Sequence, residues 1–560
     1  MSTPHNASTN RRRRLPCAAA VIATIATTTP VAADAPIAPR PTNPVRAGAL
    51  AGAERWNYDR AAHLLRRAGF GGHHDDVQYL LALGLDGAVD FLVDYENVPR
   101  TDPDFIISQP PDRRAMRRIH KHASEQDKQA IRKRLRALHN RQYADLLAWW
   151  IRRMTVTPRP FEEKMTLFWH GHFTTGVQEV KDSRFIARQN AMLRRLAVAP
   201  FGDLLKAVCH DPAMLIYLDN AKSNKAHPNE NFARELLELY TIGEGNYTEH
   251  DIKEAARALT GFAVGPDGFR FRRGQHDDGD KTFLGHTGRL DGDDIVDIIL
   301  AQPATARYLA DKLLVFFVRD DPPPELVNAV ADKLNRTNYD IRETMRAIFK
   351  SKAFYATGAR FTHIKAPIEL VVSTVRTLRP DAADYWGMTR VAASMGQQLY
   401  QPPNVKGWDG GKTWITASTL FSRYAFARAV VRGEPAKAFQ RRVARLDGIR
   451  RTVDELVDLA QHDDTYPGMT IAPQHVPLTR QMPLDPRGML GTKQHWNAHT
   501  LVDACVHLLL QRPITPQQRA TLIDIIGHPN DTVDLNVARD LRRVRTLLYA
   551  IMLMPEYQLA

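Results

Sequence analysis

The sequence predicts a mainly α-helical protein, with a large multi-helical body, long irregular loops and at most a short β-hairpin. Three observations lead to this class. Apolar residues recur at helical spacing through most of the chain after residue 55. Strand-like alternation is scarce, and "DGFRFRR", around Phe269 and Phe271, is the exception that indicates a hairpin. The length of 560 residues and the hydrophobic fraction of 44% suit a large buried core.

The predicted helices can be followed in order along the chain. The segment "DRAAHLLRRAGFG" has apolar residues at helical spacing and stops at Gly69. In "PRPFEEKMTLFWHGHF", Pro160 stands near the first turn, where proline is tolerated. Further helices are expected in "PATARYLADKLLVFFV", "HIKAPIELVVSTVRTL" and "NVARDLRRVRTLLYAIMLMPEYQ". Residues 463–495 are rich in Pro and Gly and indicate an irregular loop excursion within one domain, residues 56–560.

The first 35 residues have the composition of an export signal. Arg11 to Arg14 form a positive region, and "LPCAAAVIATIATTTPVAADA" is a weakly apolar stretch that ends in small residues suited to cleavage. The stretch is too short and too rich in Thr for a membrane span. We therefore expect a periplasmic or extracellular protein, exported by the Sec or the twin-arginine route. Residues 36–55 are expected to be a linker, and the alternative for the signal is a disordered basic tail.

The formal net charge of +14 is unevenly distributed. Residues 113–141, "RRAMRRIHKHASEQDKQAIRKRLRALHNR", hold eleven Lys and Arg against Glu125 and Asp127. With the arginines of residues 11–14 also set aside, the remainder is nearly neutral, so no specific nucleic-acid partner is expected. We expect residues 113–141 to be a basic helical insertion. It is either a solvated helix face or a contact for phosphates or an acidic glycan.

The three cysteines, Cys17, Cys209 and Cys505, do not have the spacing of a zinc site or of a disulfide framework. After removal of a signal, Cys209 and Cys505 would remain. They either pair in an oxidising compartment or stay as two isolated buried thiols.

The most informative stretch is "HPNENFARELLELYTIGEGNYTEHDIKEAARALTGF", residues 227–262. At 100° per residue its first helix has one apolar half and one polar half. The polar half holds the candidate catalytic residues Glu230, Arg234, Glu235 and Glu238. Asn229 and Asn231 are poor helix-interior residues and are candidate ligand-binding residues. The alternative is a solvated helix face with i,i+4 ion pairs around Arg234.

The turn after this helix is also well specified. Gly243 and Gly245 permit a tight turn with positive φ. Thr248 and Asp251 then form a capping pattern before a second apolar helix. The two helices are therefore expected to form an αα-hairpin that holds the carboxylates rigidly, as an acid/base pair or a metal requires.

Four residues are candidate ligands for a divalent metal ion. In "FWHGHFTTG", Gly171 can end a helix between His170 and His172, after which both side chains could converge. In "QHDDGDKTFLG", His276 and Asp277 combine two metal-binding residue types without the spacing of a calcium loop. The alternatives are separately hydrogen-bonded histidines and a polar turn.

A candidate binding loop lies in "YQPPNVKGWDGGKTWI", residues 400–415. Its prolines and glycines fix loops around Trp408 and Trp414, and aromatic rings on such loops can stack on sugars. Lys406 completes the candidate ligand-binding set and suits an acidic as well as a neutral glycan. The alternative is a loop held in place by burial of its tryptophans.

These segments together resemble the bacterial family known only as "domain of unknown function 1800". The resemblance covers roughly residues 56–425 and rests on "AAHLLRRAGFG", "MTLFWHGHF", "DPAMLIYLDN", "NENFARELLELYTIGEGNYTEHDIKEAARALTGF", "HDDGDKTFLG", "ARYLADKLLVFFV" and "MGQQLYQPPNVKGWDGGKTWI". It implies an exported, mostly helical protein and implies no particular reaction.

Two functions therefore remain open. One is a carboxylate- or metal-dependent enzyme that acts on an envelope or extracellular polysaccharide. The other is a secreted binding or assembly protein without catalytic activity, in which the same polar residues lock helices together.

Overall fold

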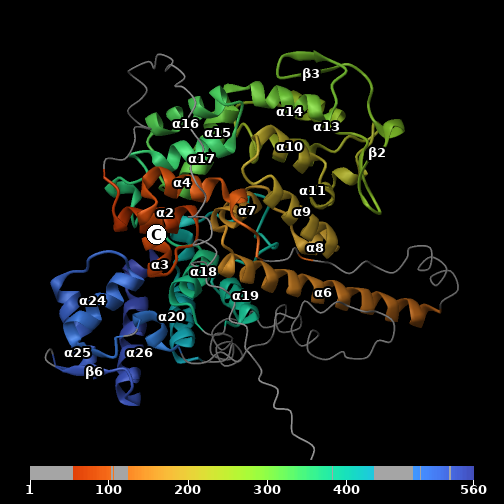
Figure 1. Cartoon of the computed structure of the whole chain (residues 1–560). Helices are drawn as coiled ribbons and strands as arrows, with labels where there is room; N and C mark the ends of the chain where they lie inside the picture. Colours follow the sequence, from red (N-terminus) through yellow and green to blue (C-terminus); the bar gives the residue numbers. More distant parts are fainter. Residues whose placement is uncertain are drawn as a thin grey trace, which may run out of the picture. The chain divides into compact units, whose positions relative to one another are not determined.

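Helices dominate the structure (Figure 1), which is a computed structural model. It describes residues 55–101, 105, 124–380, 383–433, 484–491, 493–528 and 531–560. The predicted export signal, the linker up to residue 54, residues 113–123 and residues 463–483 of the predicted loop lie outside this part. The mainly α-helical class predicted from the sequence is confirmed.

The helices of the described residues are α2 (Tyr58–Ala68), α3 (His74–Ala82), α4 (Gly84–Val93), α6 (Glu125–Val156), α7 (Pro160–His172), α8 (Val177–Val180), α9 (Ser183–Arg195), α10 (Phe201–Cys209), α11 (Pro212–Tyr217), α12 (Glu230–Glu238), α13 (Glu249–Ala258), α14 (Gly292–Ala301), α15 (Pro303–Phe317), α16 (Pro324–Arg336), α17 (Ile341–Lys350), α18 (Pro367–Leu378), α19 (Tyr385–Ser394), α20 (Ala417–Arg432), α23 (Pro486–Leu490), α24 (Ala498–Leu509), α25 (Pro516–Ile526) and α26 (Ala538–Leu553).

Local sequence accounts for where these helices begin. The Asn57 side chain caps α2 by accepting the N–H of Arg60. Thr248 and Asp251 form the predicted capping box of α13, each accepting the other's backbone N–H. Proline occupies the first turn of α7, as predicted. The α12–α13 pair is in contact, which confirms the predicted αα-hairpin.

In the described ranges, three short antiparallel strand pairs accompany the helices. The predicted hairpin is formed by β1 (Phe262–Gly265) and β2 (Gly268–Phe271), with Phe262 opposite Phe271. The other pairs are β3 (Lys281–Phe283) with β4 (His286–Gly288), and β5 (His495–Asn497) with β6 (Thr532–Asp534). Their strands have three residues each, too few for alternation to be recognised in the sequence.

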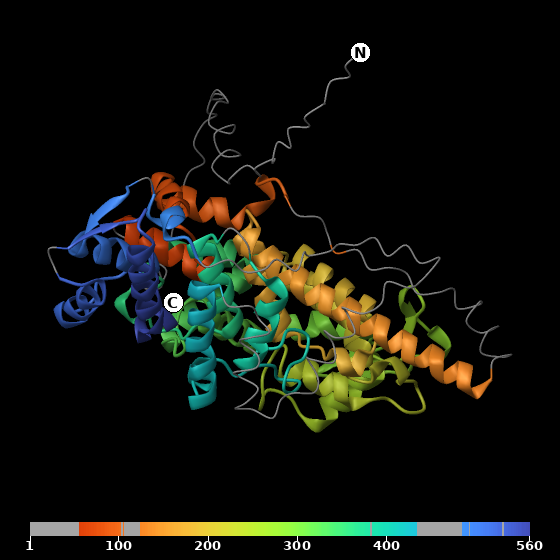
Figure 2. The ribbon, with the colours of Figure 1, turned by 90° about the horizontal axis from the view of Figure 1, so that it is seen from below.

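The basic segment belongs to a longer helix than the one expected. Helix α6 begins at Glu125 behind a Ser124 cap and continues past residue 141 to Val156 (Figure 2). Its side chains are exposed or half-buried up to Gln142, and burial begins at Tyr143. The basic part described by the structure is therefore the solvent-facing half of a helix whose other half is in the core.

Two clusters of buried apolar side chains form the core. One is built mainly from α2–α4, α7 and α10–α17. The other is built mainly from α6, α18–α20 and α24–α26. The three C-terminal helices α24, α25 and α26 contact one another and lie together in Figure 1. Helix α7 contributes Phe168 and Trp169 to the first cluster and Leu167 to the second. It therefore runs between the two cores and is buried along most of its length.

In the part of the chain that the structure describes, no helix is both long enough and apolar enough to span a membrane. Cys209 and Cys505 are both buried free thiols and do not pair with each other.

Candidate functional site

The asparagines beside α12 have structural contacts. Asn229 is the N-cap, and its side chain accepts the N–H of Asn231 at 3.0 Å. The side-chain amides of both residues donate to the carbonyl of Leu218, at 3.2 and 3.3 Å. These contacts account for two asparagines at this end of the helix without a ligand.

Arg234 pairs mainly with a residue of the next helix and not with the other candidate catalytic residues. Its guanidinium forms a bidentate pair with Glu249 of α13, at 2.8 and 2.9 Å, and lies 3.8 Å from Glu230. All three side chains are substantially exposed. The N-terminal half of α12 therefore matches the alternative of a solvated face with ion pairs, and Glu230 is separated from Glu238 by two turns.

The C-terminal half of α12 differs. Burial, and next the charge of Glu238, raise the pKa of the Glu235 carboxyl. This carboxyl forms no ion pair or side-chain hydrogen bond with any residue that the structure describes. Glu238 accepts the hydroxyl of Tyr247 at 2.9 Å. Two carboxyls one turn apart thus have different surroundings, an arrangement typical of acid/base pairs.

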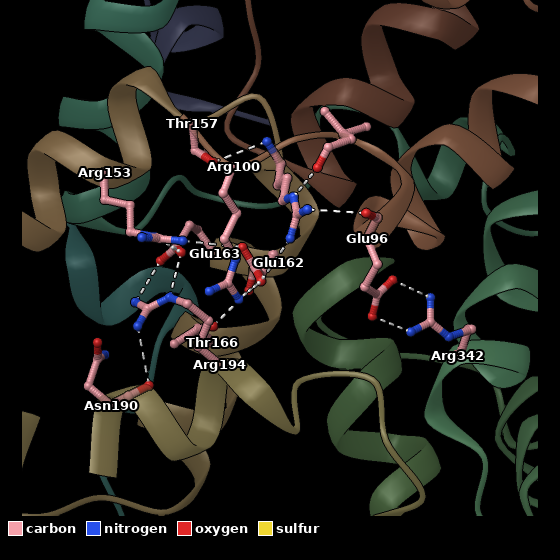
Figure 3. A network of polar contacts seen from close by, with 12 residues as sticks. Glu96, Arg100, Arg153, Thr157, Glu162, Glu163, Thr166, Asn190, Arg194 and Arg342 are labelled. Carbon is pink, nitrogen blue, oxygen red and sulfur yellow. Dashed lines mark hydrogen bonds and ion pairs between the residues drawn. The ribbon is translucent and has the colours of Figure 1, made fainter. Parts of the chain in front are cut away.

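Helix α7 is anchored at its start by a buried ionic network (Figure 3). The Glu163 carboxylate accepts from Arg194 at 2.6 and 2.9 Å, from Arg153 at 2.5 Å and from the Trp150 indole at 2.8 Å. The two arginines hold its pKa below the usual value although burial opposes this. The network fixes α7 against α6 and α9, and so fixes the position of its C-terminal end.

His172, at that end, contacts Tyr240, just after the end of α12. Its Nε2 donates to the carbonyl of Tyr240 over 3.0 Å, and its ring lies beside the Tyr240 and Tyr308 rings. Burial, and next the charge of Lys312, lower the pKa of His172 to about 3. The imidazole is therefore neutral at physiological pH, and with the proton on Nε2 its Nδ1 carries a lone pair.

The prediction that Gly171 ends the helix is wrong. Helix α7 continues through Gly171 to His172, so His170 and His172 leave the helix in different directions. His170 packs against Trp150, Tyr400 and Trp408, and its Nε2 accepts the backbone N–H of Tyr400 at 3.1 Å. Burial lowers its pKa to about 3.

The binding-loop candidate, residues 400–415, is held against the end of α7. The Thr174 hydroxyl donates to the carbonyl of Val405 at 2.6 Å, and Val177 N–H donates to that of Tyr400 at 2.8 Å. Gly407 has φ +90°, and a Cβ there would lie 2.7 Å from the carbonyl oxygen of Gly171. Only glycine permits this close approach in this conformation.

The two tryptophans of the loop have different exposure. Trp408 is half-buried beside His170. Trp414 is 6% exposed, so the expectation that its face is available to a sugar is wrong, and its ring instead holds the loop in place. Lys406 is exposed and pairs with Asp409 at 2.8 Å.

His276 and Asp277 lie elsewhere, beside the β1–β2 hairpin and α13. The Nδ1 of buried His276 is 2.9 Å from the carbonyl of Thr260. Asp277 forms a pair with Arg257, at 2.8 and 3.2 Å, and this pair holds its pKa below the usual value. Among the described residues, no three His, Cys, Asp or Glu side chains are placed to hold a metal ion. The four predicted metal ligands are thus not brought together.

Helix α15 supplies residues that the sequence did not single out. Tyr308 donates its hydroxyl to the carbonyl of Leu239 at 2.6 Å, which places α15 beside the end of α12. Lys312 lies over the Tyr308 ring at 5.0 Å, and burial lowers its pKa. Burial raises the pKa of Asp311. Neither charged side chain has an ion-pair partner among the described residues.

We call this region the α12 corner and define it by His172, Glu235, Glu238, Tyr240, Tyr308, Asp311 and Lys312. The charge of Lys406 contributes to the lowered pKa of Lys312, so the 400–415 loop lies at its edge. The buried charges Glu163 and Lys164, by contrast, are paired. Half-buried charges without partners, gathered at one place, are typical of a functional site.

Comparisons with known proteins agree with the sequence resemblance. The model of one family, described as "Protein of unknown function (DUF1800)", matches residues 63–559. No curated protein and no solved structure matches the chain. Because the match covers nearly the whole length, the chain belongs to the DUF1800 family.

Proposed function

We propose that the α12 corner is the acid/base site of an enzyme that acts on a polysaccharide of the cell envelope or the extracellular space. The observation that supports this most directly is Glu235. It is a half-buried carboxyl with a raised pKa and no partner among the described residues. A carboxyl with a raised pKa holds its proton to a higher pH than an ordinary glutamate, which favours a role as a general acid.

The roles follow from the surroundings of the two carboxyls. Glu235, the carboxyl with the raised pKa, would donate a proton to the leaving oxygen. Glu238, oriented by the Tyr247 hydroxyl, would be the second carboxyl of the pair. Residues three apart on a helix have Cβ atoms about 5–6 Å apart. This spacing is compatible with the separation of about 5–5.5 Å between carboxyls in retaining glycosidases.

A sugar polymer suits the edge of the corner. Trp408 is half-buried, so part of its ring is accessible for stacking, and Lys406 is exposed beside it. The hydrogen bonds from Thr174 and Val177 hold this loop in one position against α7. Such preorganisation favours a binding role because the loop need not be ordered when the ligand binds.

The location of the substrate rests on the proposed export signal, residues 1–35. Intact mass of protein secreted from a native-like host should give a new N-terminus near residues 34–36. A mature secreted chain that begins at Met1 or Ser2 would contradict export by a cleaved signal.

A non-catalytic binding or assembly role is the second candidate. The contacts of Asn229, Asn231 and Arg234 favour it, because all three stabilise the α12 region itself. The same loop and corner would then bind a glycan without cleaving it.

The two functions are separated by comparing Glu235→Gln and Glu238→Gln with Glu230→Gln, a matched control on the exposed end of the same helix. Each variant is incubated with peptidoglycan and with soluble acidic and neutral glycans, and new reducing ends and bound protein are both measured. If the protein is an enzyme, Glu235→Gln and Glu238→Gln should lose turnover at least a hundredfold and still bind the glycan. The Glu230→Gln control should keep wild-type turnover and binding. Binding without turnover in the wild type would favour the second candidate. Full turnover in both corner variants would refute the acid/base assignment.

A stability measurement tests the state of Glu235 without a substrate. The pKa of Glu235 is higher in the folded chain than in the unfolded chain. The free energy of unfolding therefore decreases as pH rises from the ordinary glutamate range through the folded pKa. Glu235→Gln should therefore melt higher than wild type at pH 7, and the difference should shrink as pH falls into the ordinary glutamate range. An equal difference at both pH values would contradict the raised pKa.

A further inference from the structure

Arg66, in α2, has an unusual set of contacts for a buried arginine. It is 8% exposed, and its Nη1 donates to the Gln511 side chain at 2.5 Å. Its Nε and Nη2 are buried and have no hydrogen-bond partner among the residues that the structure describes. These two nitrogens form the side-on edge of the guanidinium, which binds an oxyanion through two parallel hydrogen bonds. A buried guanidinium edge without an acceptor is costly, so it indicates an acceptor that the described part of the chain does not supply.

The surroundings of Arg66 carry an excess of positive charge. Burial, and next the charges of Arg360 and Arg67, lower the pKa of Arg66 to about 9. Lys365 is fully enclosed, and its pKa falls to about 7 because of burial first and Arg66 next. Asp59 is the acid whose charge acts most on Arg66, and it lies 3.8 Å from Arg360. The acids near this group do not balance its cations.

The group extends from the interior to the surface. Arg66 stands over the Phe361 ring at 4.3 Å, and Arg512 stands over the same ring at 4.7 Å. Arg512 and Arg360 are half-buried, and within the described residues the buried Nε of Arg360 also has no hydrogen-bond partner. Phe361 has a left-handed backbone, with φ 55°, which is strained for a bulky residue. Two half-exposed arginines thus lie near a buried third one.

We propose that Arg66, Arg360 and Arg512 form a binding site for a dianionic oxyanion of the phosphate or sulfate type. The unpartnered edge of Arg66 supplies the bidentate contact, and the two outer arginines supply further donors. The depth of Arg66 restricts the ligand to a free ion or to the terminal phosphate or sulfate group of a larger molecule. This site is separate from the α12 corner and does not depend on the function proposed for it.

The test uses the purified full chain. Sodium phosphate and sodium sulfate are titrated at constant ionic strength, with chloride as the balancing salt, and binding is followed by calorimetry and by the melting midpoint. We expect saturable binding to the wild type. Arg360→Gln and Arg512→Gln, which alter half-exposed residues and leave the core in place, should weaken binding at least tenfold each. Arg289→Gln changes an exposed arginine of the β4–α14 connection and is the matched control, with wild-type affinity.

A parallel titration with glycerol 3-phosphate distinguishes the two sources of the anion. If the protein binds inorganic phosphate but not glycerol 3-phosphate, the ligand is a free ion. If it binds both compounds, the site accepts the terminal phosphate group of a larger molecule. Selenate soaked into crystals should give an anomalous peak beside Nε and Nη2 of Arg66. Equal, non-saturating stabilisation in all four proteins, or a selenate peak elsewhere with none at Arg66, would overturn the site.

Discussion

The Nε2 atom of His170 accepts the backbone N–H of Tyr400 at 3.1 Å, across 230 residues of sequence. Tyr400 has a left-handed backbone, with φ 59°, so this hydrogen bond holds a strained residue at the start of the 400–415 loop. The end of α7 and the loop are thereby one structural unit, and the unit lies beside the α12 corner.

His170→Ala should destabilise the protein by about 1–3 kcal/mol, because it leaves the Tyr400 N–H buried without an acceptor. Urea denaturation followed by far-UV circular dichroism measures this. His227→Ala, at an exposed histidine, is the control and should change the free energy of unfolding by less than about 0.5 kcal/mol. Equal effects of the two substitutions would show that the hydrogen bond contributes nothing.

The two histidines of α7 should make stability depend on pH. Their folded pKa values lie near 3, below the ordinary value of 6.5. Between these values the unfolded chain binds protons that the folded chain does not, so stability is full above pH 6.5 and falls towards pH 3. Each histidine contributes a slope of up to about 1.4 kcal/mol per pH unit. Urea unfolding gives the free energy of unfolding at pH 6 and at pH 5. Between these two pH values that free energy should fall less in His172→Gln than in wild type. An unchanged slope would contradict the lowered pKa of His172.

Gly407→Ala should be more harmful than Gly410→Ala. Both glycines have positive φ, and alanine there costs about 1–3 kcal/mol. At Gly407 the new Cβ would also meet the carbonyl oxygen of Gly171 at 2.7 Å, whereas at Gly410 the nearest heavy atom is 4.0 Å away. The difference in free energy of unfolding therefore isolates the loop contact. Trp408 fluorescence should shift only in Gly407→Ala, and identical behaviour of both variants would refute this contact.

Glu163→Gln should destabilise the protein by about 3–5 kcal/mol, because two buried arginines lose their carboxylate. Glu125→Gln, at an exposed residue of α6, is the control and should stay within about 0.5 kcal/mol of wild type. Thermal and urea unfolding give both values. If Glu163→Gln left the free energy of unfolding unchanged, the network in Figure 3 would not be essential to the stability of α7.

Periodicity and capping could be read from the sequence because they are local. The apolar face of α12 is buried at Phe232, Ala233, Leu236 and Leu237, as a 100° repeat requires. Gly243 and Gly245 both have the predicted positive φ. The fold class and the αα-hairpin depend only on such patterns.

The grouping of the candidate site could not be predicted from sequence alone. Asp311 and Lys312 lie inside an ordinary helical pattern and reach the α12 corner through the contact of Tyr308 with Leu239. The partner of Arg234 is Glu249, on the next helix, and no spacing within α12 indicates it. The burial of Trp414 likewise depends on how a loop packs in three dimensions.

Helix α6 is a single helix of 32 residues, half in solvent and half in the core. At 1.5 Å per residue it is about 48 Å long, with burial beginning at Tyr143. Because the helix is continuous, its basic end is joined without interruption to Trp150 and Arg153, the two α6 side chains that donate to Glu163. A partner that binds the exposed half would therefore be attached to the buried ionic network through one rigid element.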